Sequence, residues 1–198
     1  MNILIAGATG KTGLRLVKEL ISRDHTPIAL VRESSDTSKL PEGVTLRHGD
    51  LTDLQEGICD GCEAVIFAAG SGGDTGPEMT DKVDRDGAKC LIDMAAKAGV
   101  SRFVMLSSVG TEDPDPEHEL GHYLQAKHEA DEHLKASGLT YAIVRPVQLT
   151  DEDGDRNIAL GNNVDPKGKA ARGDVAATLA DAVESSDWIG QVRLMQSV

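Results

Sequence analysis

Short apolar runs alternate with amphipathic segments along this chain. The spacing of apolar residues predicts helices, each with one face turned inward, over residues 11–23, 79–98, 120–136 and 174–183. The continuous apolar runs predict buried strands over residues 2–6, 27–31, 44–48, 63–69, 102–106, 140–144 and 191–195. Strands that alternate with helices indicate βαβ units and a parallel sheet covered on both faces. We therefore expect a doubly wound α/β fold.

Two stretches interrupt this alternation. Residues 71–78 are polar and rich in glycine, and residues 151–169 are polar and begin with four acids in five positions. Neither is long enough to act as a linker between domains. We expect one domain over residues 1–198, with a short substrate-side segment within residues 147–198.

Charge and cysteine content narrow the partners that we expect. The chain has 33 acidic and 20 basic residues, a formal net charge of −13, so we expect neither nucleic acid nor an anionic membrane to bind it. No run approaches the roughly 18 apolar residues of a membrane span, and three cysteines make no disulfide framework. These features predict a cytoplasmic protein with a small-molecule substrate. The acid excess fits either a salty habitat or ordinary solubility, and the oligomeric state stays open.

A glycine-rich loop lies between the first strand and the first helix. It reads Gly7-Ala8-Thr9-Gly10-Lys11-Thr12-Gly13, a G-x-x-G-x-x-G pattern. Glycine allows positive φ, a close approach of backbone to a pyrophosphate, and tight packing of helix on strand. The following helix N-terminus offers free N–H groups to phosphate. We expect a Rossmann-type dinucleotide site rather than a Walker loop, whose first glycine would fall on Ile5.

The second strand ends in Arg32, which bears on the choice of dinucleotide. An acid at such a strand end binds the ribose hydroxyls of NAD, whereas an arginine accommodates the 2′-phosphate of NADP. Arg32 predicts NADP(H), with Ser34 and Ser35 as further donors. Glu33 could instead take the NAD role, so NAD(H) stays an alternative.

Taken in order, these motifs resemble the atypical short-chain dehydrogenase/reductase superfamily, including the epimerase/dehydratase-like and biliverdin/flavin reductase-like proteins. The further matching segments are 31–32, 49–51, 67–70, 103–108 and 144–146, with a weaker match at 172–176. The resemblance implies that Asp50 and Leu51 contact adenine. It also implies that Ala68, Ala69 and Gly70 line the pyrophosphate–ribose side, and that Pro146 and Val147 lie near the nicotinamide. Asp50 could equally cap a turn and Pro146 could simply end a strand.

A Y-x-x-x-K motif, Tyr123 to Lys127, places both side chains on one helical face. A nearby ammonium stabilises a phenolate and prepares a tyrosine for acid–base work. The resemblance implies that Lys127 also holds the nicotinamide ribose and that Ser107 or Ser108, at the end of the fifth strand, binds a substrate carbonyl. Tyr123 could instead be a surface residue paired with Lys127, because this helix is rich in polar residues.

These features support two functions. The first is an NADP(H)-dependent oxidoreductase that transfers hydride to a carbonyl, quinone or flavin-like acceptor, with Tyr123 as the acid. The second is an NADP(H)-sensing regulatory protein without turnover, similar to NmrA-type regulators. Cys59 and Cys62 form a C-x-x-C that we interpret as inert thiols, because no second cysteine pair completes a zinc site. We expect no metal.

Overall fold

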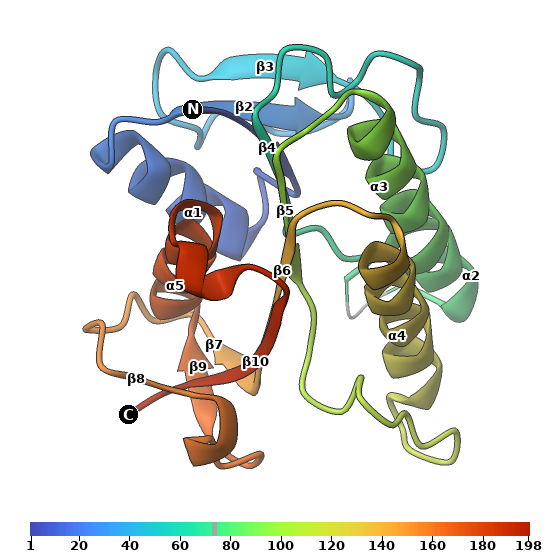
Figure 1. The fold of residues 1–198 in the computed structure, drawn as a ribbon, viewed down its shortest axis with the longest axis vertical. Helices are drawn as coiled ribbons and strands as arrows, with labels where there is room; N and C mark the ends of the chain where they lie inside the picture. The colour runs from blue at the N-terminus through green and yellow to red at the C-terminus, as the bar shows by residue number, and fades with distance from the viewer. Residues whose placement is uncertain (73–74) are drawn as a thin grey trace.

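The structure is a computed structural model that describes residues 1–72 and 75–198 (Figure 1). Its centre is an eight-stranded sheet in the order β3-β2-β1-β4-β5-β6-β10-β8. All neighbours in this sheet pair in parallel except β8, which runs antiparallel to β10. The strands are β1 (Asn2–Ala6), β2 (Thr26–Val31), β3 (Thr45–His48), β4 (Ala64–Phe67), β5 (Arg102–Leu106), β6 (Tyr141–Pro146), β8 (Ile158–Leu160) and β10 (Gln191–Ser197).

Helices cover both faces of this sheet, as the continuous apolar strands require. Figure 1 shows α1 (Lys11–Ser22) and α5 (Arg172–Glu184) on one side and α3 (Ala88–Lys97) and α4 (Gly121–Ala136) on the other. Each side encloses its own apolar core, because successive residues of a strand point to opposite faces. Ile3 and Ile5 of β1 belong to the α1–α5 core, whereas Leu4 belongs to the α3–α4 core. The doubly wound Rossmann-type fold is therefore confirmed.

The strand order reverses direction between the neighbouring strands β1 and β4. From β1 the chain first adds β2 and β3 on one side, and then returns to add β4, β5 and β6 on the other. Ligands of open α/β sheets bind at such a switch point, outside the carboxyl ends of the strands. A ligand site is therefore expected at the turns that follow β1, β4 and β5.

The structure differs from the sequence-based expectation in two places. The helix expected over residues 79–98 is divided into α2 (Pro77–Thr80), a π-helical turn η1 (Asp81–Gly87) and α3. The segment 151–169, expected to be irregular, contains β8 and the short helix η2 (Gly161–Asn163) and leads into β9 (Lys169–Ala171). Strand β9 pairs in parallel with β7 (Gln148–Thr150) in a small second sheet. These strands are three residues long, too short for a periodic pattern to be visible.

A short helix η3 (Ser186–Trp188) precedes β10. Within residues 1–72 and 75–198, no helix has the length and hydropathy needed to cross a membrane.

Candidate functional site

The glycine-rich loop joins β1 to α1 through close backbone contacts. Gly7 has φ +85°, and a Cβ there would lie 2.6 Å from the Ala69 nitrogen. A Cβ on Gly13 would overlap the carbonyl oxygen of Gly7, so the helix sits directly on the turn. Gly10, by contrast, has φ −74°, an ordinary value for any residue. It is the residue that precedes α1, and its carbonyl accepts from the Leu14 N–H.

One cleft opens beside this loop at the end of β2, and we call it the Arg32 cleft. Its volume is about 470 Å³. It contains several expected residues, namely Gly7, Thr9, Gly10, Arg32, Asp50, Leu51, Ala68, Ala69 and Gly70. Ser35, expected as a donor near Arg32, also lines the cleft. Thr52, Met79 and Val83 line it as well, and no sequence motif had pointed to them. Hydrogen bonds from the N–H and hydroxyl of Thr52 lower the pKa of Asp50.

Arg32 and Glu33 face different surroundings. Arg32 lines the cleft together with Ser35, whose hydroxyl accepts from the Arg32 N–H at 3.0 Å. The Glu33 carboxylate lies 3.1 Å from Nδ1 of His48, and Glu33 does not line the cleft. Ser34, the other expected donor, does not line it either.

A second cleft of about 480 Å³ adjoins the first, and we call it the Tyr123 cleft. Both clefts are lined by Gly10, Ala68, Ala69, Gly70, Ser71 and Thr75, so they form one groove over the carboxyl ends of β1, β4 and β5. In the Tyr123 cleft, Lys11 and Thr12 line the side of the glycine-rich loop. Ser107, at the end of β5, and Tyr123 and Lys127, on α4, line the other side. The candidate catalytic residues and the glycine-rich loop therefore border one groove.

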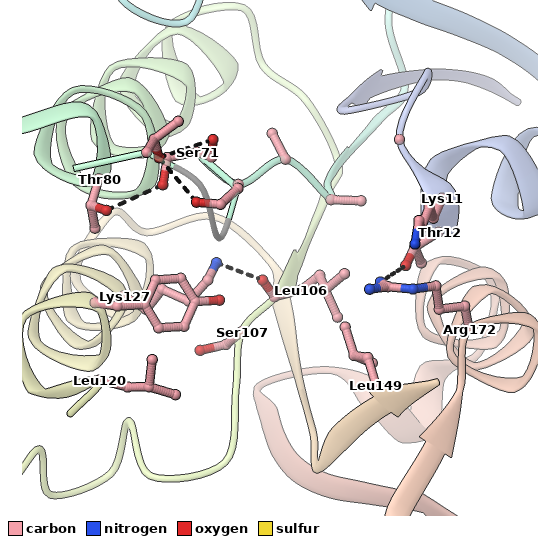
Figure 2. Close-up of a pocket in the computed structure, with 17 residues that line it drawn as sticks. Lys11, Thr12, Ser71, Thr80, Leu106, Ser107, Leu120, Lys127, Leu149 and Arg172 are labelled. Atoms are coloured by element: carbon pink, nitrogen blue, oxygen red, sulfur yellow. Dashed lines mark hydrogen bonds between the residues drawn. The ribbon is translucent and has the colours of Figure 1, made fainter. Parts of the chain in front are cut away.

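Tyr123 and Lys127 are stacked on one face of α4. Nζ of Lys127 lies 5.6 Å from the centroid of the Tyr123 ring and donates to the Leu106 carbonyl at 3.2 Å (Figure 2). The same Nζ lies 3.5 Å from Oδ1 of Asp84, an ion pair rather than a close hydrogen bond. Burial lowers the pKa of Lys127, but Tyr123, Asp84 and Asp131 raise it, and the net shift is upward. Lys127 is therefore held as a buried cation.

The two serines at the end of β5 have different environments. Ser107 lines the Tyr123 cleft, and its hydroxyl donates to Oδ2 of Asp131 at 2.8 Å. Asp131 is fully buried and accepts from Arg145 Nη2 at 3.0 Å. Ser108 lines neither cleft; its carbonyl accepts from the Thr111 hydroxyl. Of the two serines, the structure places only Ser107 beside Tyr123 and Lys127.

The wall opposite Lys127 comes from the C-terminal segment and from the start of α1. Figure 2 shows Arg172 and Leu149 across the cleft from Lys127 and Leu120. Arg172 donates to Thr12 Oγ1 at 3.1 Å and to Asp151 at 2.8 Å, and Asp151 also pairs with Lys11. The acidic start of segment 151–169 thus lies beside the loop, a contact that the sequence did not predict. The only sequence signal for Arg172 was the weak match at 172–176.

Besides Ser34, three expected cofactor contacts lie outside both clefts. Gly13 is under the turn, where it allows helix and strand to pack. Pro146 and Val147 are buried, and the Val147 N–H donates to the Met195 carbonyl. These two residues join β6 to β10 and do not border the groove.

The C-x-x-C thiols lie away from the groove. Cys59 and Cys62 are both buried, and burial is the main cause that raises their pKa values, that of Cys59 to about 12. Such thiols stay protonated at neutral pH and pack as small apolar groups. In the part of the chain that the structure describes, no group of three or more His, Cys, Asp or Glu side chains could hold a metal ion.

Comparisons with known proteins agree with the fold and with the loop. The NAD(P)H-binding family matches residues 7–186. The chain is 37% identical over 193 residues to an uncharacterized sugar epimerase of Bacillus subtilis, covering 94% of this chain and 90% of the relative.

Solved structures give the same result. A putative NAD-dependent epimerase/dehydratase from Bacillus halodurans is 35% identical, with a TM-score of 0.92 over 100% of this chain and 94% of that one. An anaerobillin reductase from Escherichia coli O157:H7 is 26% identical, with a TM-score of 0.83 over 100% and 97%. These findings confirm the resemblance drawn from the motifs and the expected class of cofactor. The chain belongs to the NAD(P)H-binding family.

Proposed function

We propose that this protein is an NADPH-dependent reductase that passes hydride to a carbonyl, quinone or flavin-like acceptor. The family is NAD(P)H-binding and reductase-like, and the proposal adds the cofactor preference, the acceptor class and the residues. All of residues 1–198 would act as one domain, in which segment 147–198 contributes Leu149 and Arg172 to the substrate side. The observation that carries the proposal is the stacked Tyr123–Lys127 pair in the same groove as the glycine-rich loop.

The groove fits a dinucleotide along its whole length. The loop backbone and the N-terminus of α1 can receive the pyrophosphate near Gly10, Lys11 and Thr12, because helix N-terminal N–H groups favour anions. The adenosine half then belongs in the Arg32 cleft, with Asp50 and Leu51. The nicotinamide half belongs in the Tyr123 cleft, where Lys127 can hold the ribose.

Two contacts favour NADPH over NADH. Arg32 and Ser35 line the Arg32 cleft side by side, and a guanidinium can bind a phosphate through two parallel hydrogen bonds. Glu33, which would suit the ribose hydroxyls of NADH, lies against His48 instead. The charged group that faces the expected position of the adenosine ribose is therefore the Arg32 guanidinium, a cation.

Tyr123 is the proton donor in this mechanism. NADPH, when bound, would supply a hydride, and for a carbonyl acceptor the Tyr123 hydroxyl would supply the proton that completes the new O–H bond. Lys127, a buried cation beside the ring, stabilises the phenolate that remains. Ser107 already donates its proton to Asp131, so Tyr123 is the group that polarises a carbonyl. Solvent then returns a proton to Tyr123.

The test compares Tyr123→Phe with Tyr141→Phe, the same change in the chain's other tyrosine, which starts β6 away from the groove. With a panel of carbonyl, quinone and flavin acceptors, Tyr123→Phe should lower turnover roughly 10²–10⁴-fold, as expected for a positioned general acid. The affinity for NADPH should stay nearly unchanged. Lys127→Ala should lower turnover and also weaken NADPH binding. Tyr141→Phe should behave as wild type.

Two results would contradict this assignment in different ways. Full activity in Tyr123→Phe removes the tyrosine from the mechanism and leaves hydride transfer to an acceptor that needs no tyrosine acid. Tight NADPH binding without turnover on any acceptor favours the sensing function instead.

A further inference from the structure

The π-helical turn η1 delivers a carboxylate into the protein interior beside the groove. Asp84 is the only acid of this turn that is buried, with 1% of its surface exposed. A π turn contains one residue more than an α turn and so redirects the side chains that follow, and such turns are frequent at functional sites. The turn is fixed against the Arg32 cleft, because a Cβ on Gly87 would lie 2.7 Å from the Leu51 carbonyl oxygen.

The two oxygens of Asp84 face two parts of the groove. Oδ2 accepts from the Ser71 N–H at 2.9 Å, and Ser71 lines both clefts. Oδ1 lies 3.5 Å from Nζ of Lys127 and has no hydrogen-bond partner among the described residues. A buried carboxylate is costly unless a cation compensates its charge, and Lys127 is the cation within reach.

The other charged groups around Lys127 have partners of their own. Asp131, one turn further along α4, is paired with Arg145 of β6 at 3.0 Å and accepts from Ser107. From β5, Leu106 offers only a neutral carbonyl. Tyr123 faces Lys127 from α4, and Arg172 of α5 lies across the cleft. Asp84 is therefore the acid whose negative charge is directed at Lys127.

We propose that Asp84 is a positioning residue that keeps Lys127 charged and directed toward Tyr123 and the groove. The consequence for turnover depends on the proposed function of Tyr123 and Lys127, whereas the effect on Lys127 itself does not. Without the Asp84 charge, one of the groups that raise the pKa of Lys127 against the effect of burial is lost, so Lys127 loses its proton at lower pH. The pair would then no longer stabilise the Tyr123 phenolate.

The direct test measures the titration of Lys127 by NMR of its ε-methylene group, identified by its absence in Lys127→Gln. Asp84→Asn removes the charge but keeps an oxygen that can accept from the Ser71 N–H. Lys127 should titrate at lower pH in Asp84→Asn than in wild type. The matched control is Asp93→Asn on α3, an exposed acid paired with His133, and it should leave Lys127 unchanged.

An unchanged Lys127 titration in Asp84→Asn would overturn the proposal. If Asp84→Asn does not fold, the titration of Lys127 in wild type still tests the proposal. A Lys127 that is already neutral near pH 8, below the ordinary lysine range, would carry no charge for Asp84 to stabilise and would refute it. Asp84→Glu, which restores the carboxylate, should return the titration toward that of wild type.

Turnover gives an independent test. The fall of activity at high pH should begin at lower pH in Asp84→Asn than in wild type. The losses of Asp84→Asn and Lys127→Gln should not add in the double variant, because both act through one ammonium. Additive losses would show that Asp84 acts only through the Ser71 loop. An inactive wild type with a shifted Lys127 titration would refute the proposed reaction and leave the role of Asp84 intact.

Discussion

Alanine substitutions at Gly7 and Gly10 should separate the stability of the loop from its binding function. Alanine at Gly7 would have to adopt φ +85°, and its Cβ would lie 2.6 Å from the Ala69 nitrogen and 2.7 Å from the Ala68 oxygen. Left-handed backbone costs an alanine roughly 1–2 kcal/mol, and over-packing against fixed atoms costs a further 1–3 kcal/mol or so. Gly7→Ala should therefore lower the free energy of unfolding by about 2–5 kcal/mol.

Gly10 is the matched control in the same loop. Its φ of −74° suits any residue, and the nearest atom to an added Cβ is the Gly7 oxygen at 3.3 Å. Replacing glycine by alanine where the backbone allows it stabilises by about 0.4–1 kcal/mol through the unfolded chain. This gain offsets the tight contact, so Gly10→Ala should unfold within about 0.5 kcal/mol of wild type. Gly10 lines both clefts, however, and its methyl group should weaken NADPH binding roughly tenfold or more, about 1.4 kcal/mol.

Thermal unfolding and NADPH titration together test this reasoning. For a chain of this size, 1 kcal/mol corresponds to about 2–4 °C in Tm, so Gly7→Ala should melt roughly 4–20 °C below wild type and Gly10→Ala within about 2 °C of it. Equal melting of the two variants would refute the argument from backbone conformation. Unchanged NADPH affinity in Gly10→Ala would show that the pyrophosphate binds elsewhere.

Three further predictions follow from particular side chains. Arg32→Ala should weaken NADPH binding roughly 10- to 100-fold, the value of a charged hydrogen bond, and leave NADH binding unchanged; calorimetry that finds equal affinities for both in wild type would contradict this. The double change of Cys59 and Cys62 to Ser should keep NADPH affinity within about threefold. It should lower the unfolding free energy by about 1–3 kcal/mol, because it buries hydroxyls. Loss of a bound metal would refute the interpretation of these cysteines as inert thiols. Burial raises the pKa of Glu19, but its hydrogen bonds to two arginines lower it by a larger amount, so the pKa in the folded protein lies below the ordinary value. Its contribution to stability is therefore present at neutral pH and is lost as pH falls through the folded pKa. Glu19→Gln should thus be less stable than wild type near pH 7 and approach it near pH 3; a constant difference would contradict the assignment.

The sequence predicted the parts of the fold that depend on local patterns. The strand over residues 2–6 and the strand over 102–106 have the same bounds in the structure, because apolar residues fill both faces of a central parallel strand. The glycine-rich loop was recognisable because a tight turn between strand and helix requires residues without side chains. These features depend on neighbours in the chain.

Other features depend on contacts between distant segments, which leave no periodic signal. The π turn at 81–87 has the composition of an ordinary polar helix, and only its packing on Leu51 and α4 gives Asp84 its place. The segment that begins at Asp151 was interpreted only as polar, yet Asp151 contacts Lys11, which is 140 positions away. The resemblance implied that Pro146 and Val147 lie near the nicotinamide, but β10 pairs beside β6 and both residues are buried.

The acid excess of the chain does not oppose the binding of an anionic dinucleotide, because several basic side chains border the groove. At physiological salt, exposed charges are screened beyond about 8 Å, so the net charge of −13 matters less than the groups that border the groove. Three of these cations are already engaged: Lys127 by Asp84, and both Arg172 and Lys11 by Asp151. Arg32 forms no ion pair with any residue in the described part of the chain. A phosphate that binds there displaces no internal partner, which is the physical reason to expect that the 2′-phosphate governs the choice of cofactor.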